Sequence, residues 1–394
     1  MLGTPFPPWP SFSSEEAEAV QKVLLSNKVN YWTGNECRLF EQEFANWTEV
    51  PYAVSLNNGT VALEMALAAL QLRPGDEVIV TPRSFLASAS CVVTAGANPV
   101  FADVSRDTQN LTADTIERVI TPRTKVIIPV HLAGMPCDMD PIMELAVARG
   151  LTVVEDCAQA HGARYKGRPI GGIGHIGAWS FCQDKIMTTG GEGGMVTTSN
   201  RALWSSMWSR KDHGKSWDAV YGQNPVHEKH AYRWLHESFG TNGRMLELQA
   251  AVGRIQLRSL PEWSAARRRN ADTIWREAAQ ISGLRAPTIP DWAEHAAYKA
   301  YVFVEPHAMK AGWSRDRIVA EINARGVPCF TGSCPELYLE KAFDQTPWRP
   351  SLPLPIAKEL GSTSLMFLVH PTLRDCHIEE TCDALRSVLG TAVH

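Results

Sequence analysis

Four segments of the sequence carry residue types suited to holding a phosphate, pairing with a cationic ring or bonding to a carbonyl carbon. The first is Asn58-Gly59-Thr60, which stands between a short apolar run and a helix-forming run. Amide groups at a helix start carry a partial positive charge and can hold a phosphate. Gly59 allows close approach to the backbone, and Thr60 adds a hydroxyl. The alternative is that Thr60 is a plain helix N-cap.

The second segment is VVEDCAQAHGA, in which Asp156 stands at the expected carboxyl end of a buried strand. Ligands of open α/β sheets bind at that edge. A carboxylate there can pair with a cationic ring nitrogen in a poorly solvated site. Gln159 follows three residues later and can face the same pocket. The alternative is that Asp156 caps a helix.

The third segment runs from Ser180 to Lys185 and continues into the glycine-rich stretch TTGGEGG at 188–194. Such glycines let the backbone wrap closely around a ligand. A desolvated lysine amine can form a Schiff base with a carbonyl compound. An isolated lysine is usually a solvated surface charge, but the strand before Lys185 and the glycines after it argue against that here.

The fourth segment, TNGRMLELQAA, places Asn242 just before a strong helix, where by itself it reads as an N-cap. Two other patterns are rejected. Gly172-x-Gly174-x-x-Gly177 matches the dinucleotide-binding fingerprint but precedes a predicted strand instead of opening a helix. The histidines 227, 230 and 236 lack nearby cysteines or acidic groups at ligand spacing, so we expect no metal site.

Strands and helices alternate through the part of the chain that must position these residues. Strands are expected at 52–56, 77–81, 99–103, 125–130, 152–156, 178–181 and 195–198. Helices are expected from the capping box Ser13-x-x-Glu16 onward and at 60–70, 86–94, 112–119 and 141–149. This alternation predicts an α/β fold with a mainly parallel sheet covered on both faces. The segment 211–240 is predicted to be a long loop.

After residue 245 the pattern of predicted elements changes. A helix at 245–260 is expected to end at Pro261, and a second helix to run over 264–281. We therefore expect a large domain of residues 1–260 and a small domain of residues 261–394. The N-terminal segment of about 1–27 is expected to pack with the small domain.

Composition excludes several classes of protein. The 394 residues carry 38 basic and 42 acidic side chains, a net charge of −4, which argues against nucleic acid as the main partner. No apolar run approaches the roughly 20 residues that span a bilayer, and the N-terminus lacks a basic and an apolar signal region. Nine scattered cysteines without a CxxC pair favour a reducing cytoplasm.

Taken together, the motifs resemble those of the DegT/DnrJ/EryC1/StrS aminotransferases. The resemblance rests on NNGTVALEMALAALQLRPGDEVIV, PVHLAG, VVEDCAQAHGA, SFCQDKIMTTGGEGGMVTT and TNGRMLELQAAVGRIQL, and later on YKAYVF, RGVPCFTGSCPELY and HPTL. It therefore covers nearly the whole chain. It implies the aspartate-aminotransferase-type fold (fold type I), with a large domain that binds pyridoxal 5′-phosphate (PLP) and a smaller C-terminal α+β domain, in a cytoplasmic homodimer.

The resemblance also implies roles for single residues. Lys185 would form the Schiff base with PLP, and Asp156 would keep the pyridine nitrogen protonated. Gln159 would lie beside the phenolic oxygen, and Phe85 would stack on the ring. The phosphate would be bound by Gly59, Thr60, Ser180 and, from the neighbouring subunit, Asn242.

The activity implied is transfer of an amino group, with L-glutamate as the expected donor, to a nucleotide-linked keto sugar, through pyridoxamine phosphate as the intermediate. Such amino sugars serve surface polysaccharides or glycosides. Related dehydratases carry histidine at the lysine position, so Lys185 argues against a sugar dehydratase, and the intact residue set argues against a non-catalytic regulatory protein. Two departures stand out: an extra glycine in TTGGEGG, and Gly243 where the family commonly has an aromatic residue.

Overall fold

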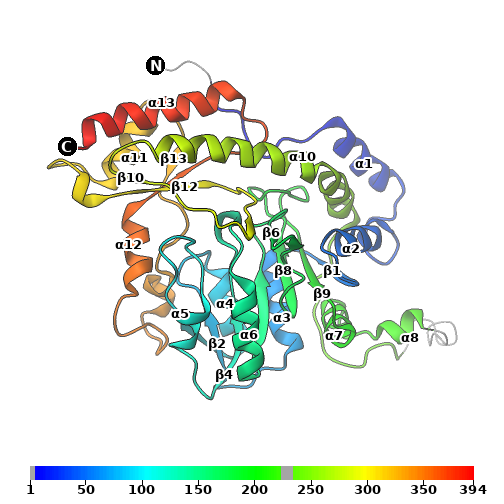
Figure 1. Cartoon of the computed structure of the whole chain (residues 1–394). Coiled ribbons are helices and arrows are strands. Elements are labelled where there is room, and N and C mark those ends of the chain that lie inside the picture. The colour runs from blue at the N-terminus through cyan, green and yellow to red at the C-terminus, as the bar shows by residue number, and fades with distance from the viewer. Residues whose placement is uncertain (1–4, 223–233) are drawn as a thin grey trace.

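The computed structural model describes residues 5–222 and 234–394. Its main sheet has seven strands in the spatial order β1-β9-β8-β5-β4-β2-β3 (Figure 1). These strands are β1 (Tyr52–Leu56), β2 (Glu77–Val80), β3 (Asn98–Phe101), β4 (Thr124–Ile128), β5 (Thr152–Asp156), β8 (Ile176–Ser180) and β9 (Gly194–Thr198). All neighbouring pairs are parallel except the two that involve β9. The predicted mainly parallel sheet is confirmed.

The helices between these strands, and one that follows the last of them, flank the sheet (Figure 1). They are α3 (Gly59–Ala69), α4 (Ala87–Thr94), α5 (Ala113–Glu117), α6 (Met139–Arg149) and α7 (Arg201–Lys211). Two helices precede the sheet, α1 (Ser14–Leu25), which begins with the predicted Ser13 capping box, and α2 (Glu36–Trp47). The sequence pattern did not predict α2. The predicted loop at 211–240 contains a short helix, α8 (Trp217–Tyr221), among its described residues.

A second sheet of four antiparallel strands has the order β10-β12-β14-β13. Its strands are β10 (Leu284–Arg285), β12 (Ala300–Val304), β13 (Cys329–Phe330) and β14 (Ser364–Phe367). The helices α11 (Arg315–Asn323), α12 (Pro355–Thr363) and α13 (Asp375–Ala392) belong to the same part of the chain. A small third sheet joins β11 (Ala293–Glu294), β6 (Arg164–Tyr165) and β7 (Arg168–Pro169).

The helix α10 (Glu247–Ala278) continues through Pro261, so the predicted break at this proline is wrong. A proline inside a helix costs about 3 kcal/mol through its missing N–H and its clash with the preceding turn. Apolar side chains of α10 before and after the proline are buried, which offsets that cost. Leu260 lies in the core of the large sheet, and Ile274 lies in the core of the second sheet.

The expected boundary at 260 thus falls inside a helix that spans both cores. The core of the large sheet also includes Tyr338 and Leu360 from the C-terminal part. The division into residues 1–260 and 261–394 remains our proposal.

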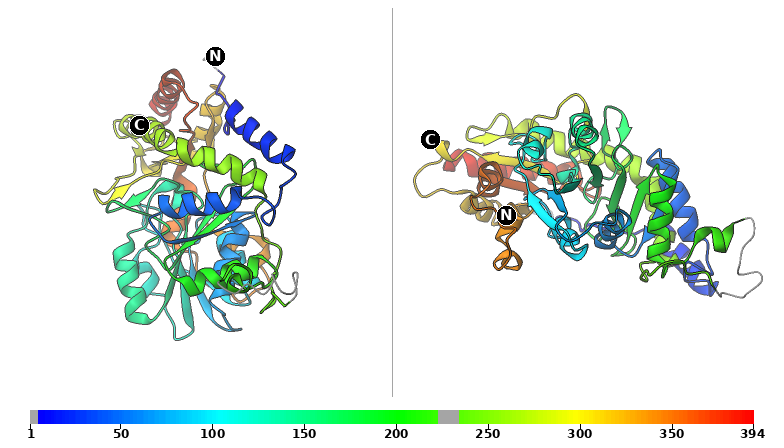
Figure 2. Two further views of the ribbon diagram at one scale, coloured as in Figure 1. Left: turned by 90° about the vertical axis from the view of Figure 1, so that its right-hand side faces the viewer. Right: turned by 90° about the horizontal axis from the view of Figure 1, so that it is seen from below.

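The N-terminal residues lie between the two cores. Figures 1 and 2 show α1 beside α10, and the ion pair Glu15–Arg258 joins the two helices. Further upstream, the ring of Phe6 lies 5.2 Å from that of His377 on α13. Trp9 donates from Nε1 to the carbonyl oxygen of Lys185 at 2.8 Å. In the described ranges, no helix combines the length and the apolar character needed to cross a membrane.

Candidate active site

Three predicted site residues meet where β1 and β8 end. The helix α3 begins at Gly59, and its N-cap is Asn58, whose Oδ1 accepts a hydrogen bond from the Val61 amide at 2.9 Å. The alternative that Thr60 is the N-cap is therefore wrong. The amides of Gly59 and Thr60 have no acceptor among the described residues. A Cβ on Gly59 would lie 2.5 Å from the Cβ of Ser180, so a residue without a side chain is required there.

Asp156 is the last residue of β5, and its side chain is almost completely buried, with 4% exposure. Its Oδ2 accepts a hydrogen bond from Ser88 Oγ at 2.8 Å, and its Oδ1 accepts one from the Ala158 amide at 3.1 Å. Burial raises the pKa of the Asp156 carboxyl, while these hydrogen bonds and the charge of Lys185 act against the rise. A cation placed beside Asp156 would therefore be held strongly, because little water competes for the carboxylate.

Lys185 lies close enough to Asp156 for its charge to act on that carboxyl. Its side chain is 15% exposed, and its Nζ lies 3.8 Å from Asp184 Oδ1 and 5.3 Å from the ring centre of Tyr298. The indole of Trp9 fixes the carbonyl group of Lys185 from the N-terminal segment. The lysine is therefore not a solvated surface charge.

Gln159 and Phe85 lie next to these groups along the chain. Gln159 is buried, and its Oε1 accepts a hydrogen bond from the Ala133 amide at 2.9 Å. Phe85 lies one turn before Ser88, whose amide donates to the Phe85 carbonyl at 3.1 Å. Phe85 is 70% exposed, so most of its ring is accessible to a ligand.

Asn242 is exposed and belongs to an extended segment that precedes α10. The N-cap of α10 is Leu246, so the alternative that Asn242 caps this helix is wrong. Asn242 forms an isolated antiparallel bridge with Asp212, and the next carbonyl, that of Gly243, accepts a hydrogen bond from the Asn57 amide at 3.0 Å. Asn242 thus projects from the surface beside the start of α3.

The extra glycine of the loop after Lys185 lies in open space. Gly190 and Gly191 both have positive φ angles, 86° and 123°, and a Cβ on either would meet no atom within 4 Å. Backbone conformation, not crowding, therefore requires glycine at these positions.

The rejection of the dinucleotide fingerprint at 172–177 is confirmed. The segment leads into β8 and opens no helix. Its backbone wraps around a carboxylate of the protein itself, because the amides of Gly171, Ile173 and Gly174 all donate to Glu155. A phosphate would be repelled from that position. Of the histidine pattern, His227 and His230 lie outside the described residues.

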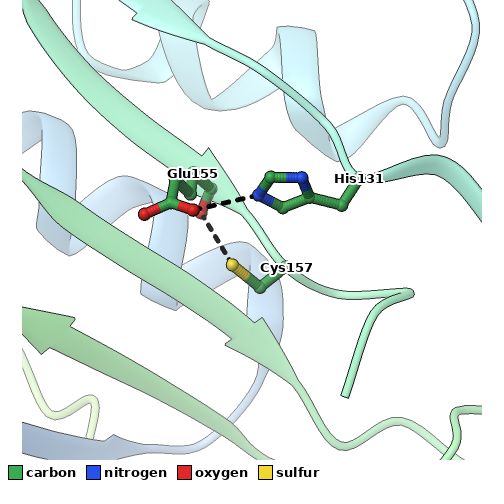
Figure 3. Close-up of side chains that lie close together, drawn as sticks. All are labelled: His131, Glu155 and Cys157. Atoms are coloured by element: carbon green, nitrogen blue, oxygen red, sulfur yellow. Dashed lines mark hydrogen bonds and ion pairs between the residues drawn. The ribbon is translucent and has the colours of Figure 1, made fainter. Parts of the chain in front are cut away.

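A cluster that the sequence motifs did not predict lies at the same strand end. Figure 3 shows His131, Glu155 and Cys157 together, with ligating atoms close enough to suggest a metal site. His131 accepts from the Cys137 amide at Nδ1, so its Nε2 carries the proton and donates to Glu155 at 3.1 Å. The Cys157 thiol donates to the Glu155 carbonyl, and burial raises its pKa well above the usual value.

These atoms are therefore engaged with one another, and the cluster lacks the thiolate that a metal prefers. It fixes the end of β5, where Asp156 follows Glu155 directly. The sequence signal for this cluster was the pair of acidic residues that ends VVED, Glu155 and Asp156. The sequence analysis assigned a role only to Asp156. Ser88, Asp184 and Tyr298 were also missed. Ser88 was recognisable by its position one helical turn after Phe85.

Comparison with known proteins agrees with this arrangement. The model of the DegT/DnrJ/EryC1/StrS aminotransferase family matches residues 10–386. The dTDP-3-amino-3,4,6-trideoxy-alpha-D-glucose transaminase of Streptomyces venezuelae is 35% identical over 375 residues, which cover 95% of this chain and 92% of that protein. The GDP-perosamine synthase of Caulobacter vibrioides is 36% identical over 350 residues, with 89% of each chain covered.

The solved structure of the aminotransferase from Psychrobacter cryohalolentis is 58% identical and has a TM-score of 0.95, covering 98% of this chain and 99% of that one. The expected aspartate-aminotransferase-type fold is thereby confirmed. The family match spans nearly the whole chain and includes Gly59, Asp156 and Lys185. The chain belongs to the DegT/DnrJ/EryC1/StrS aminotransferase family.

Proposed function

We propose that this protein is a PLP-dependent aminotransferase that moves an amino group from an amino acid, L-glutamate in the first place, to a nucleotide-linked keto sugar. The observation that carries the proposal is the convergence of Asp156, at the end of β5, and Lys185, in the loop after β8, beside the open amides of Gly59 and Thr60. The curated relatives support the substrate class, since their names specify dTDP-linked and GDP-linked amino sugars.

The residues present fit PLP at both of its ends. The phosphate dianion suits the N-terminus of α3, where Gly59 leaves room beside Ser180 for close approach. The ring nitrogen suits Asp156, because a buried carboxylate stabilises a protonated ring. When bound, PLP supplies an electron sink for the carbanion that forms as the α-proton leaves.

The protein's own groups then have distinct tasks. Lys185 Nζ would hold the cofactor through its carbonyl carbon, C4′, and, once freed by the amino donor, would move a proton from the donor's α-carbon to C4′. Gln159 would lie beside the phenolic oxygen of the cofactor, and Phe85 would cover one face of its ring. Asn242 reaches the phosphate of the neighbouring subunit in a homodimer, which its exposed position supports.

We also place the enzyme in the cytoplasm. All nine cysteines are free thiols, which agrees with a reducing compartment. The lysine at position 185 argues against the dehydratase alternative, because that chemistry uses histidine at this position. Asp156 is buried and Lys185 is largely shielded from solvent, which argues against a non-catalytic regulator, because such a protein has no need to keep both groups desolvated.

The test is the absorbance spectrum of the purified protein with PLP, first with glutamate and then with a panel of nucleotide-linked 3-keto and 4-keto sugars. We expect glutamate to convert the band of the lysine-bound cofactor to that of the aminated cofactor, and one sugar to restore it. Glutamine replaces glutamate in a parallel series to identify the donor. Absence of the lysine-bound band after PLP is supplied would contradict the proposal.

A further inference from the structure

Two side chains other than Asp156 surround the amine of Lys185. Asp184 Oδ1 lies 3.8 Å from Lys185 Nζ, and the ring of Tyr298 lies 5.3 Å from it. The Tyr298 hydroxyl donates a hydrogen bond to the other oxygen, Asp184 Oδ2. One oxygen of Asp184 therefore faces the amine while the other is fixed by a residue from a distant part of the chain.

The charge states of the pair suit this arrangement. Burial raises the pKa of Asp184, but the charge of Lys185 and the hydrogen bond from Tyr298 outweigh it, so the pKa is lowered overall. Burial, together with the charge of Asp184, raises the pKa of Tyr298 well above its usual value. Asp184 is therefore ionised at neutral pH, and the phenol keeps the proton that it donates.

Other ionisable groups also act on this position. Asp156 at the end of β5, His161 further along the same chain segment and Cys182 in the loop of Lys185 all interact electrostatically with Lys185. The remaining two, Arg267 and Lys299, are cations close to Asp184. Burial lowers the pKa of Lys299 to about 8 and that of His161 to about 3, so His161 is neutral at pH 7.

Of the carboxylates in this set, Asp156 has a separate task at the ring nitrogen. Asp184 is then the only carboxylate of the set available to the amine, and among the described residues it is the one within 4 Å of Lys185 Nζ. The charges of Arg267 and Lys299 also interact with Asp184, but no ion pair joins either of them to it among the described residues.

We propose that Asp184 is the counter-ion of the Lys185 amine and that Tyr298 is the positioning residue that holds Asp184 in place. The inference rests on the proposed function. In that reaction, Lys185 Nζ is released by the amino donor and must carry a proton before giving it up again. An anion at 3.8 Å stabilises the protonated amine during that interval and keeps its position near the reacting carbon.

The test measures the amine directly, in the full-length chain from which PLP has been removed. The chain is labelled with trace acetic anhydride at pH 8, and acetylation of Lys185 is quantified by mass spectrometry of its peptide. The neutral amine is the reactive form, so loss of the counter-ion must speed labelling. Labelling of the exposed Lys166 in the same sample corrects for differences in the amount of reagent.

We expect Asp184→Asn to label about fivefold faster than wild type at pH 8, the size expected for one partly exposed ion pair. Tyr298→Phe keeps the ring and the carboxylate and should change the rate in the same direction by a smaller factor. The matched control is Asp107→Asn, whose carboxylate is also exposed and lies 3.7 Å from Arg285, and it should leave the rate unchanged.

An unchanged rate in Asp184→Asn overturns the inference. If that variant fails to fold, Tyr298→Phe decides, and an unchanged rate there overturns it. The proposed function has a separate control in the same experiment, because PLP should protect Lys185 of the wild type from labelling. Failure of that protection contradicts the proposed function, whereas protection with no effect of Asp184→Asn contradicts only the counter-ion role.

Discussion

Ser88 Oγ lies 2.8 Å from Oδ2 of Asp156 and joins the helix α4 to the end of β5. The hydroxyl orients the carboxylate that we assign to the ring nitrogen, and the same helix begins just after Phe85, which we assign to the ring face. One short helix therefore sets two of the contacts to the cofactor.

Removing this hydroxyl should weaken cofactor binding without removing the carboxylate. We expect Ser88→Ala to raise the dissociation constant of PLP about tenfold, because a hydrogen bond to a charged group contributes about 1.5 kcal/mol or more. Fluorescence titration of the cofactor-free chain measures the constant. The matched control is Ser90→Ala on the same helix, for which no change is expected. Equal constants for Ser88→Ala and wild type would show that the hydroxyl does not orient Asp156.

Asp156→Ala removes the proposed partner of the ring nitrogen itself. We expect weak PLP binding and a fall of about 10³-fold in the rate of the glutamate half-reaction, since both charge stabilisation and orientation are lost. Stopped-flow absorbance at saturating PLP measures that rate, and Asp114→Asn, at the exposed start of α5, provides a control. A near-normal rate would exclude the ring-nitrogen role.

Lys185→Ala should abolish turnover and the absorbance of the lysine-bound cofactor. Borohydride reduction should attach PLP covalently to the wild-type peptide that contains Lys185, and to no peptide of the variant. Lys166→Ala removes an exposed lysine that pairs with Asp140, and it should label like the wild type. Transamination at the wild-type rate in Lys185→Ala would refute the assignment.

Mixed dimers test whether Asn242 acts across the subunit interface. We expect Lys185→Ala and Asn242→Asp to be inactive as separate homodimers, the second because its carboxylate repels the phosphate. A dimer with one subunit of each kind contains one site with both changes and one intact site. Differently tagged subunits, coexpressed and purified through both tags, should therefore recover about half of the wild-type activity. If Asn242 served its own subunit, both sites would be defective and no activity would return.

The stability of the fold should fall in mild acid because of buried histidines. Burial lowers the pKa of His295 from 6.5 to about 3, and its Nδ1 accepts a hydrogen bond from the Ala297 amide. The unfolded chain binds a proton at this residue below pH 6.5 that the folded chain does not bind. The free energy of unfolding therefore decreases as the pH falls from 6.5 toward 3, by about 1 kcal/mol per pH unit for each such histidine.

His295→Asn replaces Nδ1 with an oxygen acceptor and removes the titrating ring. Urea midpoints at pH 7 and pH 5 should differ less in this variant than in the wild type, whatever its absolute stability. His307→Asn, at an exposed position, is the control. An equal pH dependence in His295→Asn and wild type would show that this residue does not contribute.

The sequence alone determined the sheet and the chemistry-bearing residues. Regular alternation of apolar runs with helix-forming runs permits few arrangements other than a parallel sheet, and the carboxyl ends of such strands gather at one edge. Asp156 was therefore recognisable as a site residue from its place at a strand end, and Lys185 from its place between a strand and a glycine-rich loop. The resemblance to the family motifs indicated the cofactor and the substrate class. The spacing of apolar residues carries no information about either.

Only the tertiary structure decided which side chains support these residues. Three hydrogen bonds come from segments that are remote in the chain: Ser88 donates to Asp156, Tyr298 to Asp184, and Trp9 to the carbonyl of Lys185. Local sequence patterns carry no information about such contacts. The continuity of α10 through Pro261 was also decided by packing, because two cores stabilise a helix that the local rule interrupts. Local propensity is a small free energy for each residue, and burial in a shared core outweighs it wherever the two disagree.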